Sequence, residues 1–497
     1  MKQLFSLRTV RGGILLLCLL PGLQVLPVSA PGQTPITTGM SEQELGGILD
    51  PIFAEQMEKL HIPGAVVVVV KDGRIAFTKG YGYADLEKRS PVVAEKTIFR
   101  IGSITKVFTA TAVMQLADRG RINLRDDVNK YLKGVKVPPT YPQPITVANL
   151  LTHTSGLDEI SPGRRTDDQS KVIPLETFLK TRLVRYLPPG KVIIYSTYNA
   201  ALAGLLVESL TQTPFKTYLR QNVFATLGMS HTSISAVQNE FKDDLAGGYE
   251  YDGKNYQRLP FQWFHTYPAS DINSTATDMA RFMIAQLQGG AIEGGRVLSS
   301  RATQEMQSTH FRNHPRLPGW AYGFYEGEQN GLRFVEHGGS MDDGYSALLT
   351  LFPSRGVGLF VACNTEQGGF GLGEAVKKAI LDRYFPARVR LEAGGALTKE
   401  SPEALKRFAG KYRPIIYCHS CPANSNAYLP DPAEVTVNPD GTLLFQDEQW
   451  RQIEPLLFKA ATGPRAGKAL LGFREDSEGK IIFMFQESYR VYERVLR

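Results

Sequence analysis

The sequence is poor in the residues that bind metals and form redox sites. Its eight histidines are spread thinly along 497 residues, without the close spacing that metal ligands show, so neither a metal nor another cofactor is expected. Among its four cysteines, Cys418 and Cys421 lie in a Pro/Asn-rich loop between strand-like segments, which is not the helix start of a redox motif. The pair is expected to form a local disulfide or to remain as two idle thiols.

The chain also lacks a concentration of positive charge. The formal net charge is +7, but lysine and arginine are scattered among aspartate and glutamate. No basic block is interleaved with aromatic residues, so the pattern is that of a solvated surface and no nucleic-acid partner is expected. The sequence Gly-x-Ser-x-Gly is absent as well, which argues against the nucleophile turn of an α/β-hydrolase.

No apolar run is long enough to span a bilayer as a helix. The run at residues 14–26 is broken by Pro21 and falls short of the roughly 20 apolar residues that a spanning helix needs. Basic residues precede this run, and the small residues Val28-Ser29-Ala30 follow it. This arrangement predicts a signal peptide over residues 1–30, no permanent membrane span, and an exported protein in the periplasm or outside the cell. The basic residues are Lys2, Arg8 and Arg11.

An apolar content of 42% with ordinary charge is typical of a globular chain of two or three domains. A capping box at Ser41 starts a helix that is predicted to reach about residue 60. Hairpins are predicted around Asp72-Gly73 and Asn330-Gly331, and the middle of the chain, residues 97–290, is mostly helical in pattern. Strands then return before a last helix at 374–384. Early and late strands around a helical middle predict one α+β domain over residues 41–386, with an antiparallel sheet built from both ends. The expected strands are 65–70, 74–78, 322–328, 332–336, 346–352 and 358–363.

The composition and the predicted secondary structure change after residue 386. Residues 387–402 are rich in Ala, Gly, Ser and Pro and are predicted to be a linker. Short strands separated by turn signals follow, and their regular spacing predicts a small antiparallel barrel or sandwich over residues 403–497. The expected strands are 434–437, 442–446, 452–458, 469–474 and 480–485.

The most informative motif is Ser103-Ile104-Thr105-Lys106. Residues three apart on a helix share a face, and the apolar residues that follow predict a helix buried nearly all round. In such surroundings desolvation disfavours the ammonium of Lys106, so the neutral amine can take the proton of Ser103. Ser103 is therefore a candidate nucleophile. Taken alone, the tetrad also fits a plain helix N-terminus with a surface lysine.

Two further clusters suit an acyl-transfer site. Tyr195 lies just ahead of an apolar helix that Ser196 and Thr197 can cap, and its phenol could relay a proton. His337-Gly338-Gly339 ends a predicted strand, where glycines let a substrate approach the backbone closely. His153, in a turn containing glycine, is expected to be structural rather than catalytic.

Taken in order, these elements resemble the serine β-lactamase and D-alanyl-D-alanine carboxypeptidase superfamily, most closely the class C β-lactamase-like branch. The resemblance covers roughly residues 45–385 and is reinforced by residues 99–102, 153–157, 274–278 and 338–345. The last part of the chain is similar to the small, lipocalin-like β-barrel appended to many members. The resemblance implies a β-lactamase/transpeptidase-like fold followed by that barrel.

The resemblance also implies roles for single residues. Ser103 would form an acyl-enzyme, Lys106 would accept its proton, and Tyr195 would protonate the leaving group and help to activate the deacylating water. Substrate would be bound at Thr197 and along the late strand, with the backbone amides of Ser103 and Ser340 forming an oxyanion hole. The residues of that strand are His337, Gly338, Gly339 and Ser340.

Two positions depart from the family pattern. Thr197 stands where relatives have asparagine, and so lacks the reach and second donor of an amide. His337 stands where relatives often have lysine, and a neutral imidazole near pH 7 is a poorer anchor for a carboxylate. The implied activity is an exported serine hydrolase acting on a small-molecule or peptide substrate, whether β-lactam, D-amino-acid peptide or carboxylic ester. The alternative is a non-catalytic protein that binds cell-wall peptides or a protein partner. The oligomeric state stays open.

Overall fold

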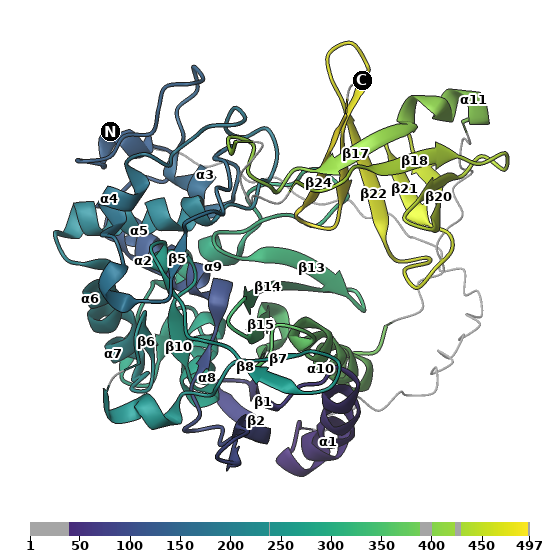
Figure 1. The fold of residues 1–497 in the computed structure, drawn as a ribbon. Coiled ribbons are helices and arrows are strands. Elements are labelled where there is room, and N and C mark those ends of the chain that lie inside the picture. Colours follow the sequence, from purple (N-terminus) through teal and green to yellow (C-terminus); the bar gives the residue numbers. More distant parts are fainter. Residues whose placement is uncertain (1–38, 238, 388–399, 423–428, 496–497) are drawn as a thin grey trace, which may run out of the picture. The chain divides into compact units, whose positions relative to one another are not determined.

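The computed structural model describes residues 39–237, 239–387, 400–422 and 429–495 (Figure 1). The predicted signal peptide, residues 1–30, and residues 388–399 of the predicted linker therefore lie outside the described residues. Within the described ranges, no helix is long and apolar enough to cross a membrane.

An antiparallel sheet is built from both ends of the first domain, as predicted. Strands from residues 64–91 pair with strands from residues 325–363, because β1 lies beside β16. In the described part of the chain the sheet has seven strands. Their order is β13 (Tyr325–Gln329), β14 (Leu332–Met341), β15 (Tyr345–Phe352), β16 (Val357–Cys363), β1 (Gly64–Lys71), β2 (Arg74–Asp85) and β3 (Ser90–Pro91).

Both faces of the sheet are buried under helices. Side chains alternate along β1, so Val67 and Val69 pack toward α1 (Glu42–Lys59) and α10 (Gly369–Tyr384), which lie side by side in Figure 1. Their neighbours Val66, Val68 and Val70 pack toward α2 (Thr105–Asp118) and α8 (Ala276–Leu287). A strand covered on both faces appears in sequence as an unbroken apolar run, as β1 does.

The predicted hairpin turns are confirmed. Asp72 and Asn330 have φ angles of 49° and 54°, and the glycines after them have φ angles of 81° and 75°. Two consecutive left-handed residues match the right-handed twist of the flanking strands, and Asn-Gly and Asp-Gly adopt them readily. One half of the predicted capping box is present: Ser41 Oγ accepts a hydrogen bond from Glu44 N at 3.3 Å.

The strand that carries His337 is longer than predicted. The expected strand ended at residue 336, but β14 continues to Met341. Glycine at 338 and 339 lets the strand pass closely between its neighbours, because a Cβ atom at Gly338 would lie 2.2 Å from the ring of Phe370. A Cβ atom at Gly339 would lie 2.0 Å from the carbonyl oxygen of Ile101. Gly339 is therefore required where the strand packs against the backbone before Ser103, whereas a side chain at Gly338 would displace the exposed ring of Phe370.

The helical middle places two helix starts next to each other. The short 3-10 turn η1 (Gly102–Ile104) carries Ser103 into α2, and Tyr195 precedes α5 (Thr197–Thr211), which packs against α2. Smaller elements surround this pair. The helices are α3 (Val147–Leu151), α4 (Leu175–Leu179), α6 (Phe215–Leu219), α7 (Ala225–Leu227) and α9 (Ser300–Gln307), and the strands are β4 (Phe99–Arg100), β5 (Arg165–Thr166), β6 (Ser233–Ile234), β7 (Tyr249–Tyr251), β8 (Tyr256–Arg258), β9 (Trp263–Phe264), β10 (Ile272–Ser274), β11 (Ala291–Ile292) and β12 (Gly295–Arg296).

The last part of the chain is a closed antiparallel barrel, preceded by α11 (Pro402–Leu405). Its core includes the fully buried side chains of Trp450 and Tyr412. The structure therefore has a barrel and not a sandwich. Within the described residues its eight strands are β17 (Gly410–Pro414), β18 (Ala433–Val437), β19 (Leu443–Phe445), β20 (Glu448–Glu454), β21 (Leu457–Ala460), β22 (Leu470–Glu475), β23 (Ile481–Gln486) and β24 (Arg490–Arg494).

One strand prediction in the barrel was wrong. Residues 452–458 are not a single strand, because β20 ends at Glu454 and β21 begins at Leu457. Pro455 stands between them, and proline has no N–H to give to a strand ladder. Strands β17 and β24, which pair with each other and close the barrel, were not predicted from the sequence.

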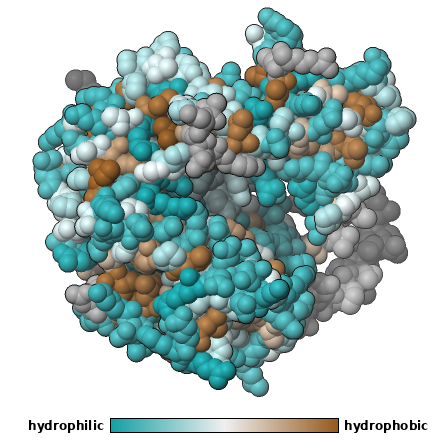
Figure 2. Space-filling model, viewed as in Figure 1, coloured by the Kyte–Doolittle hydropathy of each residue, from teal (hydrophilic) through white to brown (hydrophobic). Residues whose placement is uncertain are grey.

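The surface carries only small apolar groups on the side that Figure 2 shows, each surrounded by hydrophilic residues. Among the described residues, the large apolar side chains that are exposed are Ile75, Tyr83, Val93, Ile173, Val184, Tyr256, Phe370 and Leu429.

Candidate active site

Ser103 and Lys106 are in direct contact at the start of α2. Lys106 Nζ lies 2.8 Å from Ser103 Oγ and donates a second hydrogen bond, of 3.0 Å, to the carbonyl oxygen of Ala269. Only 3% of Lys106 is exposed. Burial lowers the pKa of Lys106 from 10.5 to about 7, while Glu159 raises it and Arg164 lowers it. Near neutral pH a large share of the amine is therefore uncharged and able to accept the proton of Ser103.

Tyr195 lies against the same pair. Its ring centroid is 4.9 Å from Lys106 Nζ and 4.5 Å from the ring of His153, on which it stacks. Burial raises the pKa of Tyr195 above its usual value, and a hydrogen bond with Ser103 opposes that shift. The phenol therefore holds its proton at neutral pH and is suited to donating it.

His153 is structural, as expected, and supports Tyr195. Its φ angle is 54°, and its Nδ1 accepts hydrogen bonds from Ser196 N at 3.1 Å and from the Asn199 side chain at 3.0 Å. Burial and the nearby charge of Lys106 hold the pKa of His153 well below 6.5. The neutral ring thus fixes both the backbone after Tyr195 and the face on which the phenol ring stacks.

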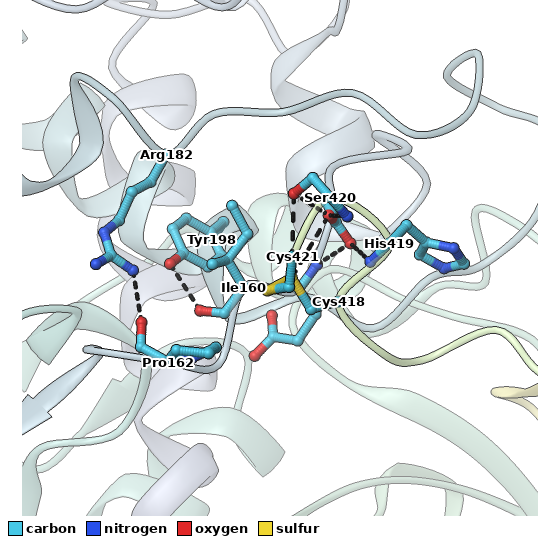
Figure 3. Close-up of a disulfide and its surroundings, with 10 residues drawn as sticks. Ile160, Pro162, Arg182, Tyr198, Cys418, His419, Ser420 and Cys421 are labelled. Atoms are coloured by element: carbon cyan, nitrogen blue, oxygen red, sulfur yellow. Dashed lines mark hydrogen bonds between the residues drawn. A yellow bond between two sulfur atoms is a disulfide. The ribbon is translucent and has the colours of Figure 1, made fainter. Parts of the chain in front are cut away.

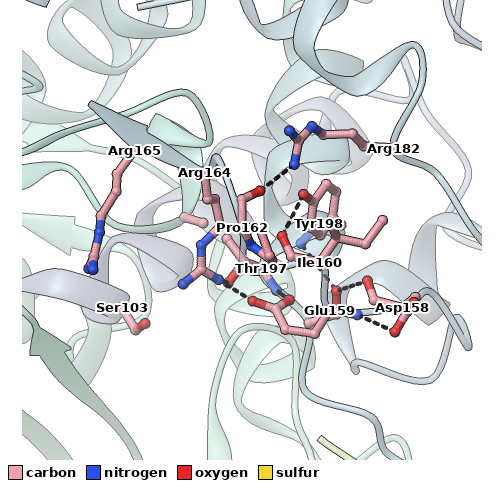
Figure 4. A network of polar contacts seen from close by, with 12 residues as sticks. Ser103, Asp158, Glu159, Ile160, Pro162, Arg164, Arg165, Arg182, Thr197 and Tyr198 are labelled. Atoms are coloured by element: carbon pink, nitrogen blue, oxygen red, sulfur yellow. Dashed lines mark hydrogen bonds and ion pairs between the residues drawn. The ribbon is translucent and has the colours of Figure 1, made fainter. Parts of the chain in front are cut away.

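A polar network holds the first turn of α5 (Figure 4). Thr197 N donates a hydrogen bond of 2.6 Å to Glu159 Oε2, and Thr197 Oγ1 accepts one of 2.9 Å from Arg164 Nη1. The same Nη1 is paired with the Glu159 carboxylate. A carboxylate is favoured at a helix N-terminus, where backbone N–H groups lack partners. The Thr197 hydroxyl is thus already engaged by Arg164 before any substrate arrives.

The late strand passes directly beside Ser103. A Cβ atom at Gly339 would lie 3.3 Å from Ser103 N, and one at Gly102 would lie 3.0 Å from Ser340 N. The backbone amides of Ser103 and Ser340 therefore belong to two segments in close contact, as a shared oxyanion site requires.

His337 lies in the interior of the sheet. It is 2% exposed, and its Nδ1 donates to the carbonyl oxygen of Gly338 at 2.7 Å. Its Nε2 is buried without a hydrogen-bond partner among the described residues. Burial, together with the charge of Lys106, lowers the pKa of His337 to about 3. The imidazole is neutral at pH 7, and this geometry does not support it as a carboxylate anchor.

A cavity of about 310 Å³ opens in front of Ser103. Four predicted site residues line it together: Ser103, Tyr195, Thr197 and Ser340. Four other predicted site residues do not line it: Lys106, His337, Gly338 and Gly339. The remaining lining residues are Glu159, Ser161, Arg164, Phe264, Ser270, Met341, Asp342, Ile416 and Tyr417.

Several of these residues were not found from the sequence. Arg164 lines the cavity and its neighbour Arg165 does not, and neither was singled out from the sequence. Figure 4 shows both side chains on the same side of the network as Ser103. Arg165 pairs with Asp342. The only feature of the sequence that could have drawn attention to them is that two arginines are adjacent. Ile416 and Tyr417 come from the barrel, more than 300 residues from Ser103, and no local pattern marks them.

A buried ion cluster joins the segment before Ser103 to the segment after Ser340. Arg100 is fully buried, pairs with Asp343, and lies 2.9 Å from Asp271 Oδ1 through Nη2. Its Nη1 also donates to the carbonyl oxygen of Gln262 at 2.7 Å. Burial raises the pKa of Asp271 to about 6, against the charge of Arg100. The ion pairs of Arg100 thus link the predicted motifs at 99–102 and 338–345, and they clamp β14 beside Ser103.

Cys418 and Cys421 form a disulfide, which decides between the two predicted alternatives (Figure 3). Among the described residues, no group of three or more His, Cys, Asp or Glu side chains is arranged to hold a metal ion.

Comparison with known proteins extends over most of the chain. The family described as Beta-lactamase matches residues 49–381. Protein flp of Staphylococcus aureus (strain N315) is 29% identical over 335 residues, which cover 66% of this chain but only 64% of the relative's own length. A beta-lactamase of Yersinia enterocolitica is 28% identical over 297 residues, or 59% of this chain and 73% of that protein. The structure titled "Crystal structure of SurE with D-Leu" superposes with a TM-score of 0.64 at 21% identity, covering 91% of this chain and all of that one.

Proposed function

The chain belongs to the Beta-lactamase family, whose members are generally serine hydrolases, and from this premise we propose that it is an exported hydrolase that forms an acyl-enzyme on Ser103. The observation that carries the proposal is the 2.8 Å contact between Ser103 Oγ and the buried amine of Lys106, whose pKa is lowered to about 7. A serine next to a neutral lysine is an activated nucleophile.

Acylation uses the groups around the cavity in turn. Lys106 takes the proton of Ser103 as Oγ attacks the carbonyl carbon of the substrate. The backbone amides of Ser103 and Ser340 stabilise the negative charge that develops on the carbonyl oxygen. The Tyr195 phenol gives its proton to the leaving group as the bond to the acyl carbon breaks. Water then attacks the ester, its proton passes to Tyr195, and Ser103 recovers its own proton.

The substrate is an amide or ester: a β-lactam, a D-amino-acid peptide or a carboxylic ester. Small esters are favoured over acylamino β-lactams for two reasons. The Thr197 hydroxyl accepts from Arg164 and lacks the second donor of an amide. His337 is neutral and buried, so it offers no cation to a substrate carboxylate. Export is supported by the signal-peptide pattern of residues 1–30, and N-terminal sequencing of the mature protein tests it.

A second candidate is a binding protein without catalysis, favoured by the same replacements at Thr197 and His337. A fluorophosphonate probe for active-site serines separates the two candidates. We expect one stoichiometric adduct by intact-mass measurement on the native protein and none on Ser103→Ala. Folded native protein that stays unlabelled would favour the binding function. A panel of penicillins, D-Ala-D-Ala peptides and p-nitrophenyl esters then identifies the substrate class by which compound turns over.

A further inference from the structure

Two side chains of the barrel line the cavity in front of Ser103. Ile416 and Tyr417 follow β17, in the connection to β18, and line the cavity together with Glu159 and Arg164. Both are half-buried. The cavity, at about 310 Å³, lies at the small end of the range for ligand pockets, so its walls decide which groups fit.

A disulfide-closed turn comes immediately after these two residues and binds a buried carboxylate (Figure 3). Asp158 is 1% exposed and accepts hydrogen bonds from His419 N at 3.0 Å, from Ser420 N at 2.8 Å and from Ser420 Oγ at 2.6 Å. A buried carboxylate that lost these donors would keep its desolvation cost without compensation. The turn at Cys418–Cys421 is therefore held firmly on the first domain.

Asp158 also connects this turn to the catalytic end of α5. Its backbone carbonyl accepts a hydrogen bond of 3.1 Å from Ser196 Oγ. The next residue, Glu159, accepts a hydrogen bond from Thr197 N and forms an ion pair with Arg164. Residues 158 and 159 thus contact both the barrel turn and the residues after Tyr195.

Apolar and aromatic contacts hold the same part of the barrel. The ring of Tyr186 stacks on His419 with centroids 3.4 Å apart. Ile415 and Val491 of the barrel share a buried cluster with Ile194. At the tip between β23 and β24, the ring of Tyr489 lies 5.5 Å from that of Tyr325.

From these contacts we propose that the barrel is part of the substrate site: the Cys418–Cys421 turn holds Tyr417 and Ile416 as a fixed wall, and these two side chains limit the size of the acyl group that reaches Ser103. The inference rests on the proposed acyl-enzyme function. It specifies the substrates of that function as amides or esters with compact acyl groups. Tyr417 and Ile416 determine specificity, whereas Asp158 and the disulfide are positioning groups that act through them.

The test compares kcat/KM for p-nitrophenyl acetate, butyrate and octanoate, which share one leaving group and differ in acyl length. The native enzyme is expected to prefer acetate. Tyr417→Ala should raise the octanoate-to-acetate ratio about tenfold, the effect of opening a pocket by several methylene-sized volumes. Ile416→Ala should shift it less, and Tyr417→Phe should keep the native ratio. Leu429→Ala is the matched control, because Leu429 lies in the same connection, is 57% exposed and does not line the cavity.

The positioning role is tested with the double variant Cys418→Ser/Cys421→Ser. It should shift the ratio in the same direction as Tyr417→Ala, through KM for octanoate, while the pH profile of acetate hydrolysis stays native. A purely stabilising disulfide would lower the melting temperature and leave the ratio unchanged, which contradicts the positioning role. If the double variant does not fold, the octanoate-to-acetate ratios of the Tyr417 and Ile416 variants alone decide whether these side chains limit acyl size.

Failure of this inference differs from failure of the proposed function. Native protein that reacts with the fluorophosphonate probe, but whose acyl preference is the same in Tyr417→Ala, overturns the inference and leaves the function standing. Folded native protein that does not react overturns both.

Discussion

Arg164 donates a hydrogen bond of 2.9 Å to the hydroxyl of Thr197, at the position where related enzymes have asparagine. The threonine is therefore part of a pre-formed network with Glu159 and is not a free group awaiting substrate. We therefore expect the departure from the family pattern to affect substrate preference and to leave the contact between Ser103 and Lys106 intact.

The first prediction concerns that preference. Thr197→Asn should raise kcat/KM for a penicillin relative to that for p-nitrophenyl acetate, because the amide adds a donor and reaches further than the hydroxyl. Parallel initial-rate measurements on the two substrates give the ratio. If the native enzyme hydrolyses the penicillin as fast as the variant does, Thr197 is not what limits β-lactam turnover.

The pH dependence follows from the buried lysine. Lys106 must be neutral to act as base, and burial lowers its pKa to about 7, so kcat/KM should fall about tenfold for each pH unit below that value. Glu159 raises the pKa of Lys106, so Glu159→Gln should move the midpoint to lower pH. A pH–rate profile from 5 to 9 measures both effects, and a flat native profile down to pH 5 would exclude Lys106 as the base.

Tyr195→Phe tests the proton donor. Removing the phenol should slow amide hydrolysis by about 10²–10⁴-fold, the usual contribution of general acid catalysis. In kcat/KM, which reports acylation, a p-nitrophenyl ester should lose much less, because p-nitrophenolate leaves without a proton. Comparing kcat/KM on an amide and on the ester shows the difference. Equal losses on both would assign Tyr195 a role in positioning and not in proton donation.

Much of this site could be predicted because its signals are local. Ser103 and Lys106 are three residues apart on one helix, and the apolar residues after them already indicated the burial that lowers the lysine pKa. The hairpins at Asp72 and Asn330 depend only on their own turn residues.

What could not be predicted depends on contacts between distant parts of the chain. His337 was expected at a strand end near the substrate, but β14 runs on through it because Gly338 and Gly339 fit against Phe370 and Ile101. The same applies to Tyr417, which lines the cavity from the barrel connection whose turn binds Asp158. Neither contact has a signature in the local sequence.

The buried cluster around Arg100 predicts a large loss of stability. Arg100→Met leaves the carboxylates of Asp271 and Asp343 buried without their partner, which should lower the free energy of unfolding by about 3–5 kcal/mol. Urea unfolding followed by circular dichroism measures the change. Glu403→Gln, which breaks an exposed pair with Lys406, is the control and should cost no more than about 1 kcal/mol. A similar small loss for Arg100→Met would show that the cluster does not clamp β14.

The central claim is that Ser103 carries the acyl group. The most direct measurement is rapid acid quenching during turnover of p-nitrophenyl acetate, followed by proteolysis and mass mapping of the acetylated peptide. The account predicts a single acetyl group on Ser103 that appears within the first turnovers and is absent in Ser103→Ala. An acetyl group on another residue, or turnover by the folded Ser103→Ala variant at the native rate, would contradict it.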